Sequence, residues 1–367
     1  MEHKNILEKI AEPLLEWYDK DHRILPWRIN KDPYRIWISE IMLQQTRVEA
    51  VKPYYARFME RFPSIDALAE AEEEVLLKYW EGLGYYSRAR NLKKAAVILM
   101  NEYGGRMPET WEELQKLPGI GSYTAGAIAS IAFGKRVPAV DGNVLRILSR
   151  LRMDAEFITL PAVKKRVEKE LLEVMPVRAG DFNQALMELG ATVCIPNGEA
   201  KCDICPWNAF CLARMHECVA EYPRKEKKKK RQIEKKTILI LKDGDNVVIH
   251  KRPDKGLLAG LYELPMLEGH LSKADVIVKL KEMGFYPIRI EKLPDSVHIF
   301  SHKEWHMTGY AVRVDEFISG NMLEEYLFVH PKETEAVYPI PSAFAAYAKY
   351  LNIKLGNEKF ECESDIT

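Results

Sequence analysis

Apolar residues in the first half of the chain recur at intervals of three and four, which places them along one face of an α-helix. Proline and glycine residues interrupt this pattern where helices end. The pattern therefore predicts a helical first half, with helices that include residues 67–80, 91–103 and 171–175.

The second half of the chain mixes strand and helix patterns. Two apolar runs, 237–242 and 247–252, flank the segment 243–246 (DGDN), which is typical of the turn of a β-hairpin. A further strand is predicted at 305–314, and helices near 272–284 and 341–351. This half is therefore expected to have an α+β fold.

Length and local charge indicate the domain organisation. The 367 residues are 47% hydrophobic, which suits about two domains that each bury a core. The net charge is zero, but residues 221–237 carry nine Lys or Arg against three Glu and no apolar periodicity. Such a segment is typical of a solvated linker, and it suits solubility, spacing or contact with nucleic acid. We predict a helical domain at 1–220, a linker at 221–236, an α+β domain at 237–357 and a tail at 358–367.

Apolar runs and cysteine positions limit the class of protein further. No run of about 18 apolar residues is present, and the first residues are charged throughout, so we expect neither a membrane span nor a signal peptide. Five of the six cysteines lie between Cys194 and Cys218, unlike the disulfide framework of a secreted protein. These features predict a cytoplasmic protein with a metal site.

Four of these cysteines have a compact spacing, Cys194-x7-Cys202-x2-Cys205-x5-Cys211. Four thiolates on one short loop can close around a single metal centre. The spacing alone leaves a structural zinc ion and an iron–sulfur cluster equally open. Cys218 and Cys362 lie outside the spacing and are interpreted as ordinary thiols.

A second motif, at 117–125 (LPGIGSYTA), lies between two predicted helices. Gly119 and Gly121 permit a tight turn whose backbone N–H groups, with the start of the next helix, can hold a phosphate without reading bases. Carbonyl groups near these glycines also offer ligands for a structural cation. The alternative is a plain corner between two helices.

The hairpin, the segment 140–144 (VDGNV) and the cysteine loop occur in the order and separation found in helix–hairpin–helix DNA glycosylases related to endonuclease III. Within that superfamily, residues 25–28 (LPWR), 37–46 (WISEIMLQQT) and 82–86 (GLGYY) resemble the adenine DNA glycosylases, the MutY family. The resemblance extends from about residue 20 to residue 215. It implies a [4Fe–4S] cluster on the four cysteines, although the seven residues between Cys194 and Cys202 are one more than the family commonly has.

Cleavage of an N-glycosidic bond needs a group that protonates the leaving base and a group that stabilises the sugar cation, which suits two carboxylates in unlike environments. Glu40 stands among apolar residues, where burial would raise its pKa and let it protonate N7 of adenine and later activate water. The resemblance implies that Asp141 stabilises the oxocarbenium ion or briefly bonds to C1′, with Asn143 as its polar neighbour. The alternatives are a solvent-facing helical Glu40 and a purely capping Asp141.

Tyr123 occupies the hairpin position at which the bifunctional relatives carry a lysine that forms a Schiff base. A phenol cannot form that imine, so the resemblance implies a monofunctional glycosylase that leaves an abasic site.

The adenine must leave the base stack before it can react. By resemblance, the residues that wedge into the duplex are Leu43, Gln45 and Tyr85. The residues that would line the adenine pocket are Arg23, Trp27, Arg28 and Gln184. For Trp27 and Tyr85 the alternative is a half-buried aromatic residue of a helical core.

The second half resembles the Nudix-related domain of these glycosylases through residues 260–265 (GLYELP). A Nudix hydrolase binds divalent metal through acidic residues of its Nudix box, but here only Glu282 is acidic at those positions, since the others are Ile277, Val278, Lys279 and Lys281. We therefore expect recognition rather than hydrolysis. The segment Phe300-Ser301-His302 matches the loop with which the family inspects 8-oxoguanine, and Ser301 is expected to hydrogen-bond the modified base. The alternative is that Phe300 and His302 only close a strand end.

Together with these features, the resemblance implies a monomeric DNA N-glycosylase of base excision repair that removes adenine opposite 8-oxoguanine or guanine. We expect it in the cytoplasm at the nucleoid and away from membranes. Three alternative functions are also compatible with the sequence. They are a lyase that acts on damaged pyrimidines, a non-catalytic DNA-binding or redox-sensing protein, and a nucleotide hydrolase that acts through the second domain.

Overall fold

The structure, a computed structural model, describes residues 6–226, 230–314 and 325–356. The chain divides into two compact units, residues 1–70 with 91–228 and residues 71–90 with 229–367. The predicted tail at 358–367, with Cys362, lies outside the described residues, as do residues 227–229 of the predicted linker.

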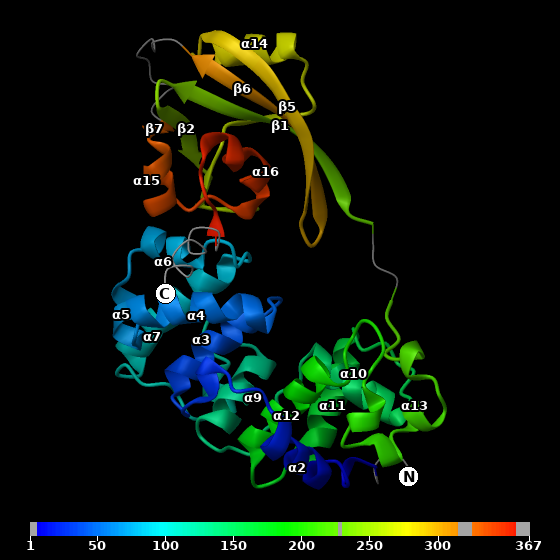
Figure 1. Cartoon of the computed structure of the whole chain (residues 1–367). Coiled ribbons are helices and arrows are strands. Elements are labelled where there is room, and N and C mark those ends of the chain that lie inside the picture. The colour runs from blue at the N-terminus through cyan, green and yellow to red at the C-terminus, as the bar shows by residue number, and fades with distance from the viewer. Residues whose placement is uncertain (1–5, 227–229, 315–324, 357–367) are drawn as a thin grey trace, which may run out of the picture. The chain divides into compact units, whose positions relative to one another are not determined.

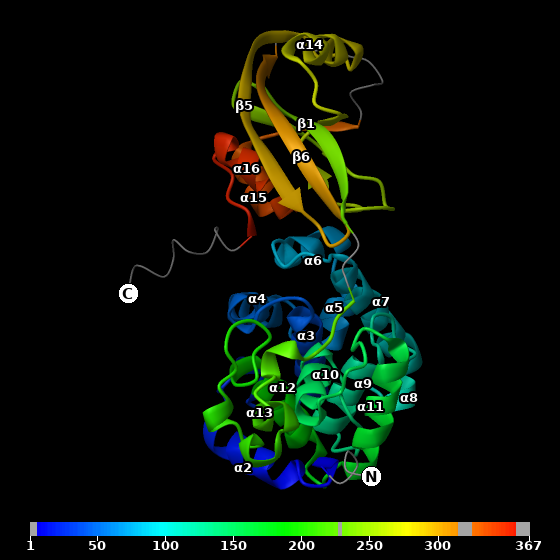
Figure 2. The ribbon, with the colours of Figure 1, turned by 90° about the vertical axis from the view of Figure 1, so that its right-hand side faces the viewer.

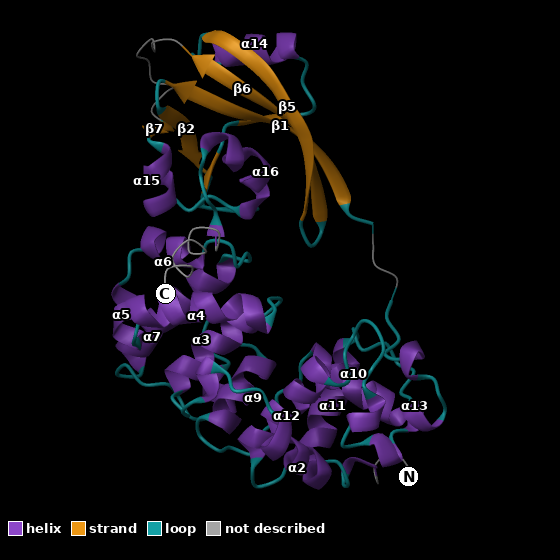
Figure 3. Ribbon diagram, in the orientation of Figure 1, coloured by secondary structure: helices purple, strands orange, loops and turns teal. Residues whose placement is uncertain are grey.

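The first unit is helical, as the sequence pattern predicts (Figures 1 and 3). One of its hydrophobic clusters is formed mainly by helices α2, α10, α11 and α12, which bury residues such as Leu14, Leu148 and Phe182. The helices of this unit are α2 (Ala11–Asp21), η1 (Pro26–Arg28), α3 (Pro33–Leu43), α4 (Val48–Arg61), α5 (Ile65–Glu70), α7 (Ser87–Glu102, from Asn91 onward), α8 (Trp111–Leu114), α9 (Ser122–Ile131), α10 (Gly142–Arg152), α11 (Pro161–Val174), α12 (Ala179–Thr192), η2 (Cys202–Ile204), η3 (Asn208–Phe210), α13 (Leu212–Met215) and η4 (Val219–Glu221).

The second unit is an α+β domain that also contains α6. Strand order in its sheet is β3-β2-β1-β6-β5, with β4 paired to β1 and β7 paired to β2. The elements are α6 (Glu73–Trp80), β1 (Gln232–Asp243), β2 (Asn246–Lys251), β3 (Tyr262–Glu263), β4 (Met266–Glu268), α14 (Lys273–Glu282), β5 (Pro287–Ile299), β6 (Lys303–Val314), β7 (Tyr326–Val329), α15 (Pro331–Ala336), η6 (Ser342–Phe344), α16 (Ala345–Ala348) and η7 (Lys349–Leu351).

Both faces of this sheet are covered, as Figure 2 shows for α14 on one side and α16 on the other. Successive residues of a strand point to opposite faces, so the unbroken apolar run of β1 serves two cores. Ile238 and Ile240 pack with Phe344 and its neighbours, whereas Leu239 and Leu241 pack with residues of α14. The predicted hairpin at 243–246 is confirmed by the antiparallel pairing of β1 with β2.

Two boundaries differ from the sequence-based prediction. Strand β1 begins at Gln232, inside the predicted linker, because Gln232 to Lys236 pair in parallel with β6. Charged side chains there have partners, since Glu234 accepts hydrogen bonds from Lys303 and from the indole of Trp305. The predicted helix 67–80 is two helices, interrupted at residues 71 and 72, and the second of them, α6, belongs to the second unit.

In the described ranges, every helix is too short or too polar to cross a lipid bilayer.

Candidate active site

Glu40 lies in helix α3 of the first unit. Asp32 caps this helix by accepting hydrogen bonds from the backbone N–H groups of Tyr34 and Arg35, and Pro33 occupies its first turn. Eight of the eleven helical residues are buried, and Glu40 is one of them, at 6% exposure. The structure thus buries Glu40, as its apolar neighbours in sequence predict.

Tyr123 brings the hairpin to this carboxylate. It stands in the first turn of α9, and its hydroxyl donates a hydrogen bond of 2.6 Å to Oε2 of Glu40. The same hydroxyl oxygen lies 3.0 Å from Sδ of Met187 on α12. Burial and the neighbouring carboxylates raise the pKa of Tyr123 well above its usual value, so the phenol keeps its proton.

Burial is the main influence on Glu40, and it raises the pKa of this carboxyl to about 7. The hydrogen bond from Tyr123 and the charge of Arg28 lower the pKa, and the charge of Asp141 raises it. A carboxyl with a pKa near neutrality can both give and take a proton at physiological pH.

Asp141 caps the start of α10 and faces the same cavity. Its Oδ1 accepts from the backbone N–H of Val144 at 2.8 Å, and its Oδ2 accepts from Nδ2 of Asn143 at 2.7 Å. Burial raises the pKa of Asp141, whereas these hydrogen bonds and the charge of Arg146 lower it. The predicted pairing of Asp141 with Asn143 is therefore present, and capping accompanies it.

One cavity contains every residue predicted for the chemistry and for the adenine pocket. Beside Glu40, Tyr123, Asp141 and Asn143, its lining includes Arg23, Trp27, Arg28, Gln184 and the predicted wedge residue Leu43. Trp27 is buried and packs edge-on against Tyr55 at 5.4 Å between ring centres.

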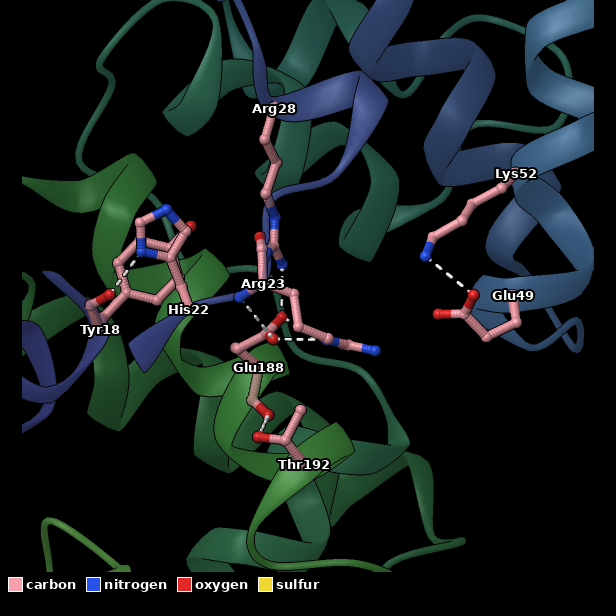
Figure 4. Close-up of polar contacts among 8 residues, drawn as sticks. All are labelled: Tyr18, His22, Arg23, Arg28, Glu49, Lys52, Glu188 and Thr192. Carbon is pink, nitrogen blue, oxygen red and sulfur yellow. Dashed lines mark hydrogen bonds and ion pairs between the residues drawn. The ribbon is translucent and has the colours of Figure 1, made fainter. Parts of the chain in front are cut away.

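Sequence reasoning missed Glu188, which lines the same cavity. This buried carboxylate of α12 pairs with Arg23 at 2.6 Å and with Arg28 at 2.8 Å (Figure 4). Burial opposes its ionisation, but the hydrogen bonds and charges of both arginines lower the pKa of Glu188. The signal available in the sequence was an acidic residue four positions after Gln184, one turn along the same helix face.

The other two wedge residues have unusual backbone conformations. Gln45, exposed after the end of α3, has φ of 59° and Tyr85, in the second unit, has φ of 48°. Tyr85 is held by Arg88, whose guanidinium lies 5.5 Å from its ring centre and donates to the carbonyl oxygens of Leu83 and Gly84. An ordered loop therefore presents the half-exposed Tyr85 ring.

Phe300, Ser301 and His302 form the turn between β5 and β6 in the second unit. Ser301 is exposed, and its hydroxyl lies 2.9 Å from that of Tyr85. The ring of Phe300 packs edge-on against Trp305. The predicted recognition loop and Tyr85 line one further cavity of this unit.

The hairpin has the predicted tight turn between α8 and α9. Gly119 has φ of 79°, and a Cβ added there would lie 2.8 Å from Cβ of Asn91. Gly121 is the N-cap of α9, with φ of −91° and open space around it. Only Gly119 is thus required by the backbone to be glycine.

The four cysteines predicted to bind metal are half-buried and line one cavity. Arg150 of α10 donates to Sγ of Cys194 at 3.2 Å. Burial raises the pKa of Cys205 to about 12, and the three other thiols add to this rise. Among the described residues, no three Cys, His, Asp or Glu side chains are arranged as ligands of one metal ion.

Helix α10 connects the cysteine loop with Asp141. Arg146 donates to Oδ1 of Asn143 at 3.0 Å and to the carbonyl oxygen of Cys194 at 3.0 Å. Asn143 in turn donates to Asp141.

Comparisons with known proteins identify the families of both parts of the chain. Residues 38–176 match the family described as HhH-GPD superfamily base excision DNA repair protein, and residues 237–350 match the NUDIX domain. The mouse adenine DNA glycosylase is 38% identical over 362 residues, covering 83% of this chain and 70% of the mouse protein. That of Buchnera aphidicola is 35% identical over 316 residues, covering 85% of this chain and 89% of its own.

Among solved structures, a thermostable thymine-DNA glycosylase superposes with a TM-score of 0.53 at 30% identity, covering 58% of this chain and 98% of that one. Endonuclease III in a non-covalent complex with DNA superposes with a TM-score of 0.50 at 25% identity, covering 58% and 97%. Fold, site and matches together define a helix–hairpin–helix DNA glycosylase of base excision repair with a C-terminal Nudix-like domain. Within that class, the chain belongs to the family of adenine DNA glycosylases.

Proposed function

We propose that this protein is a monofunctional glycosylase that removes adenine opposite 8-oxoguanine, and opposite guanine, from duplex DNA. The observation that carries the proposal is the hydrogen bond from Tyr123 to Glu40 inside the cavity that Asp141 also lines. Two carboxylates in unlike environments suit acid-assisted departure of a base, and no amine of the hairpin is available at position 123.

Glu40 is the general acid and then the general base. With a pKa of about 7, a large share of its carboxyl is protonated at neutral pH and can donate to N7 of the extruded adenine. Protonation turns the base into a better leaving group. The resulting carboxylate can then take a proton from the water that attacks C1′.

Asp141 stabilises the positive charge that develops on the sugar. Its two hydrogen bonds, from Val144 and Asn143, favour the ionised form and fix the carboxylate at the helix N-terminus. Such a preorganised charge is worth more in a cavity from which substrate excludes water.

Adenine must be extruded before this chemistry, and the proposed wedge residues Leu43, Gln45 and Tyr85 occupy the space that it leaves. Arg23, Trp27, Arg28 and Gln184 receive the base in the cavity. The hairpin at Gly119 and Gly121 holds the DNA backbone, where its carbonyl groups could also bind a structural cation.

Lesion recognition is proposed for Phe300, Ser301 and His302. In 8-oxoguanine N7 becomes a hydrogen-bond donor, and the exposed Ser301 hydroxyl is an acceptor. Helix α14, which lies within the described residues, does not provide the acidic ligands of a Nudix box, since Lys279 pairs with Glu282 and Val278 is exposed.

The four cysteines are proposed to hold a [4Fe–4S] cluster. Thiolates are the usual ligands of such clusters, so Cys194, Cys202, Cys205 and Cys211 would hold it. The shared cavity and the donation from Arg150 to Cys194 fit this group. When bound, the cluster would cross-link the loop 194–211 and fix it against α10.

We further propose that the protein acts as a monomer on double-stranded DNA, in the cytoplasm and at the nucleoid.

Single-turnover incubation tests the proposal with duplexes that carry adenine opposite 8-oxoguanine, guanine or thymine. The expected result is abasic sites in the first two duplexes only, with strand breaks only after treatment with alkali. Strand breaks without alkali would indicate a lyase instead. Retention of adenine in every duplex would indicate a non-catalytic DNA-binding protein instead.

A further inference from the structure

A buried carboxylate that the proposed chemistry does not use lies in the adenine pocket. The side chain of Glu188 has 0% exposure, and an ion buried without partners costs several kcal/mol. Its partners are two arginines proposed for adenine binding. The two arginines are therefore the residues on which Glu188 acts directly.

Glu188 fixes both arginines at once. Arg23 donates to it through Nε at 2.6 Å, through Nη2 at 3.1 Å and through its backbone N–H at 3.2 Å. Arg28 donates to it through Nη2 at 2.8 Å and to the carbonyl oxygen of Arg23 through Nη1 at 3.2 Å. Figure 4 shows the carboxylate of α12 facing both guanidinium groups, whose orientation it thereby fixes.

Both arginines still line the cavity, where the side chain of Arg23 is 34% exposed and that of Arg28 is 14% exposed. Arginine donates only, and the ring nitrogens of adenine accept, so this pair suits a neutral base. Two cations side by side repel each other, and Glu188 offsets one of the two charges.

Of the three ions in this cluster, Arg28 also acts on Glu40. The groups with charge or a titratable proton that act on it are Tyr123 of α9, Asp141 before α10 and Arg28 of η1. The cavity also contains Arg47 and Glu49 at its lining and Glu188 on α12. Of these groups, only Glu188 contacts Arg28 in an ion pair.

We propose that Glu188 is a positioning residue for adenine excision, which holds Arg23 and Arg28 in the orientation that receives the base and offsets the charge of Arg28 near Glu40. This inference rests on the proposed function. Without the carboxylate, Arg28 can turn toward Glu40 and favour its ionised form. The proton that the reaction needs is then lost at a lower pH.

Single-turnover excision with saturating enzyme on the adenine:8-oxoguanine duplex tests this role across the pH range. Glu188→Gln keeps the size and removes the charge. We expect it to lower the rate constant about 10- to 100-fold, as misplacement of binding groups does. The alkaline decline of the rate should also move to lower pH, while affinity for a duplex with a non-cleavable adenine analogue stays the same. Glu188→Asp, which keeps the charge, should restore the position of the decline and part of the rate.

Asp19→Asn is the matched control. Asp19 binds Arg178 through both oxygens, at 2.7 and 2.9 Å, but about half of each side chain is exposed. The rate and pH profile of the Asp19→Asn variant should equal those of the unmodified protein. An unchanged rate in Glu188→Gln would overturn this inference. It would also be overturned if the pH profile were unchanged and the loss of rate matched the loss of folded protein. Either result would leave the proposed function standing. Absence of adenine excision by the unmodified protein would overturn the proposed function as well.

Discussion

The pKa of Glu40 determines where on the pH scale the protein should work. Burial raises it to about 7, and the reaction uses the protonated form. The protonated fraction of Glu40 is high below pH 7 and falls as pH rises through that value, so activity should fall with it. We expect kcat/KM to fall about tenfold for each unit of pH above about 7. A carboxyl with an ordinary pKa would have lost this activity near pH 5.

Glu40→Gln tests the same assignment by removal of the proton. The amide keeps the shape and can still accept a hydrogen bond from Tyr123. We expect excision to fall by at least about 10² to 10⁴ with little change in duplex affinity. Single-turnover rates and binding isotherms would check this, and substantial excision by the variant would refute the role of Glu40.

Asp141 combines a structural with a chemical role, and two substitutions separate them. Asparagine caps a helix about as well as aspartate, so Asp141→Asn should keep the melting temperature and lower the excision rate about 10² to 10³-fold. Asp141→Ala should also lose about 1 kcal/mol of capping and about 2–4 °C in melting temperature. Thermal melts and single-turnover rates would check this, and full activity of Asp141→Asn would contradict the electrostatic role.

Ser301 should affect discrimination rather than chemistry. Loss of one hydrogen bond of about 0.5–1.5 kcal/mol in Ser301→Ala should reduce the preference for 8-oxoguanine over guanine about two- to tenfold. The ratio of the two single-turnover rate constants measures this effect. Ser296→Ala, on β5 outside the recognition loop, is the control, and equal ratios in both variants would exclude Ser301 as the reader.

Residue-scale chemistry could be predicted from the sequence only where a motif marks it. The burial of Glu40 and the hydrogen bond from Asn143 to Asp141 depend on residues that are close in sequence, and the structure shows both. Glu188 carries no motif, and its partners lie 160 and 165 positions away. Only the fold brings them together.

At the scale of the element, the hairpin depends on one of its two glycines. Gly119 has a positive φ, and an added Cβ would clash with Asn91, whereas Gly121 has neither constraint. Gly119→Ala should therefore cost about 1–3 kcal/mol, which corresponds to a fall of about 2–12 °C in melting temperature, and should weaken duplex binding. Gly121→Ala should melt like the unmodified protein, and equal melting of the two variants would contradict this account.

Elements with strong periodicity were predictable, and those whose ends depend on tertiary contacts were not. Helix α14 begins at the predicted place because Ser272 and Asp275 form a capping box. The basic residues at the start of β1 have no strand periodicity of their own, and pairing with β6 decides their conformation. A helix period likewise could not reveal that α5 and α6 are separate.

At the scale of the whole molecule, the second unit contains two distant stretches of chain. Residues 71–90 join 229–367, and periodicity gives no indication of which unit a helix joins. A buried ion pair helps to fix this stretch, because Lys78 lies 3.1 Å from Glu81 and donates to the carbonyl oxygens of Thr334 and Tyr338. Glu81 accepts a hydrogen bond from the backbone N–H of Ile340 at 2.9 Å.

Tyr85 lies four residues after Glu81 in the chain. The ion pair should therefore keep the Tyr85 hydroxyl next to that of Ser301. Glu81→Gln leaves the buried Lys78 without its carboxylate, a loss of about 3–5 kcal/mol in comparable buried pairs. We expect faster amide hydrogen exchange in α6 and at Ile340, together with a lower preference for 8-oxoguanine over guanine. Lys251→Gln is the control, because Lys251 and Glu74 form a half-exposed pair worth no more than about 1 kcal/mol. If both variants exchange and discriminate alike, the buried pair does not position Tyr85, and the recognition loop acts without this support from α6.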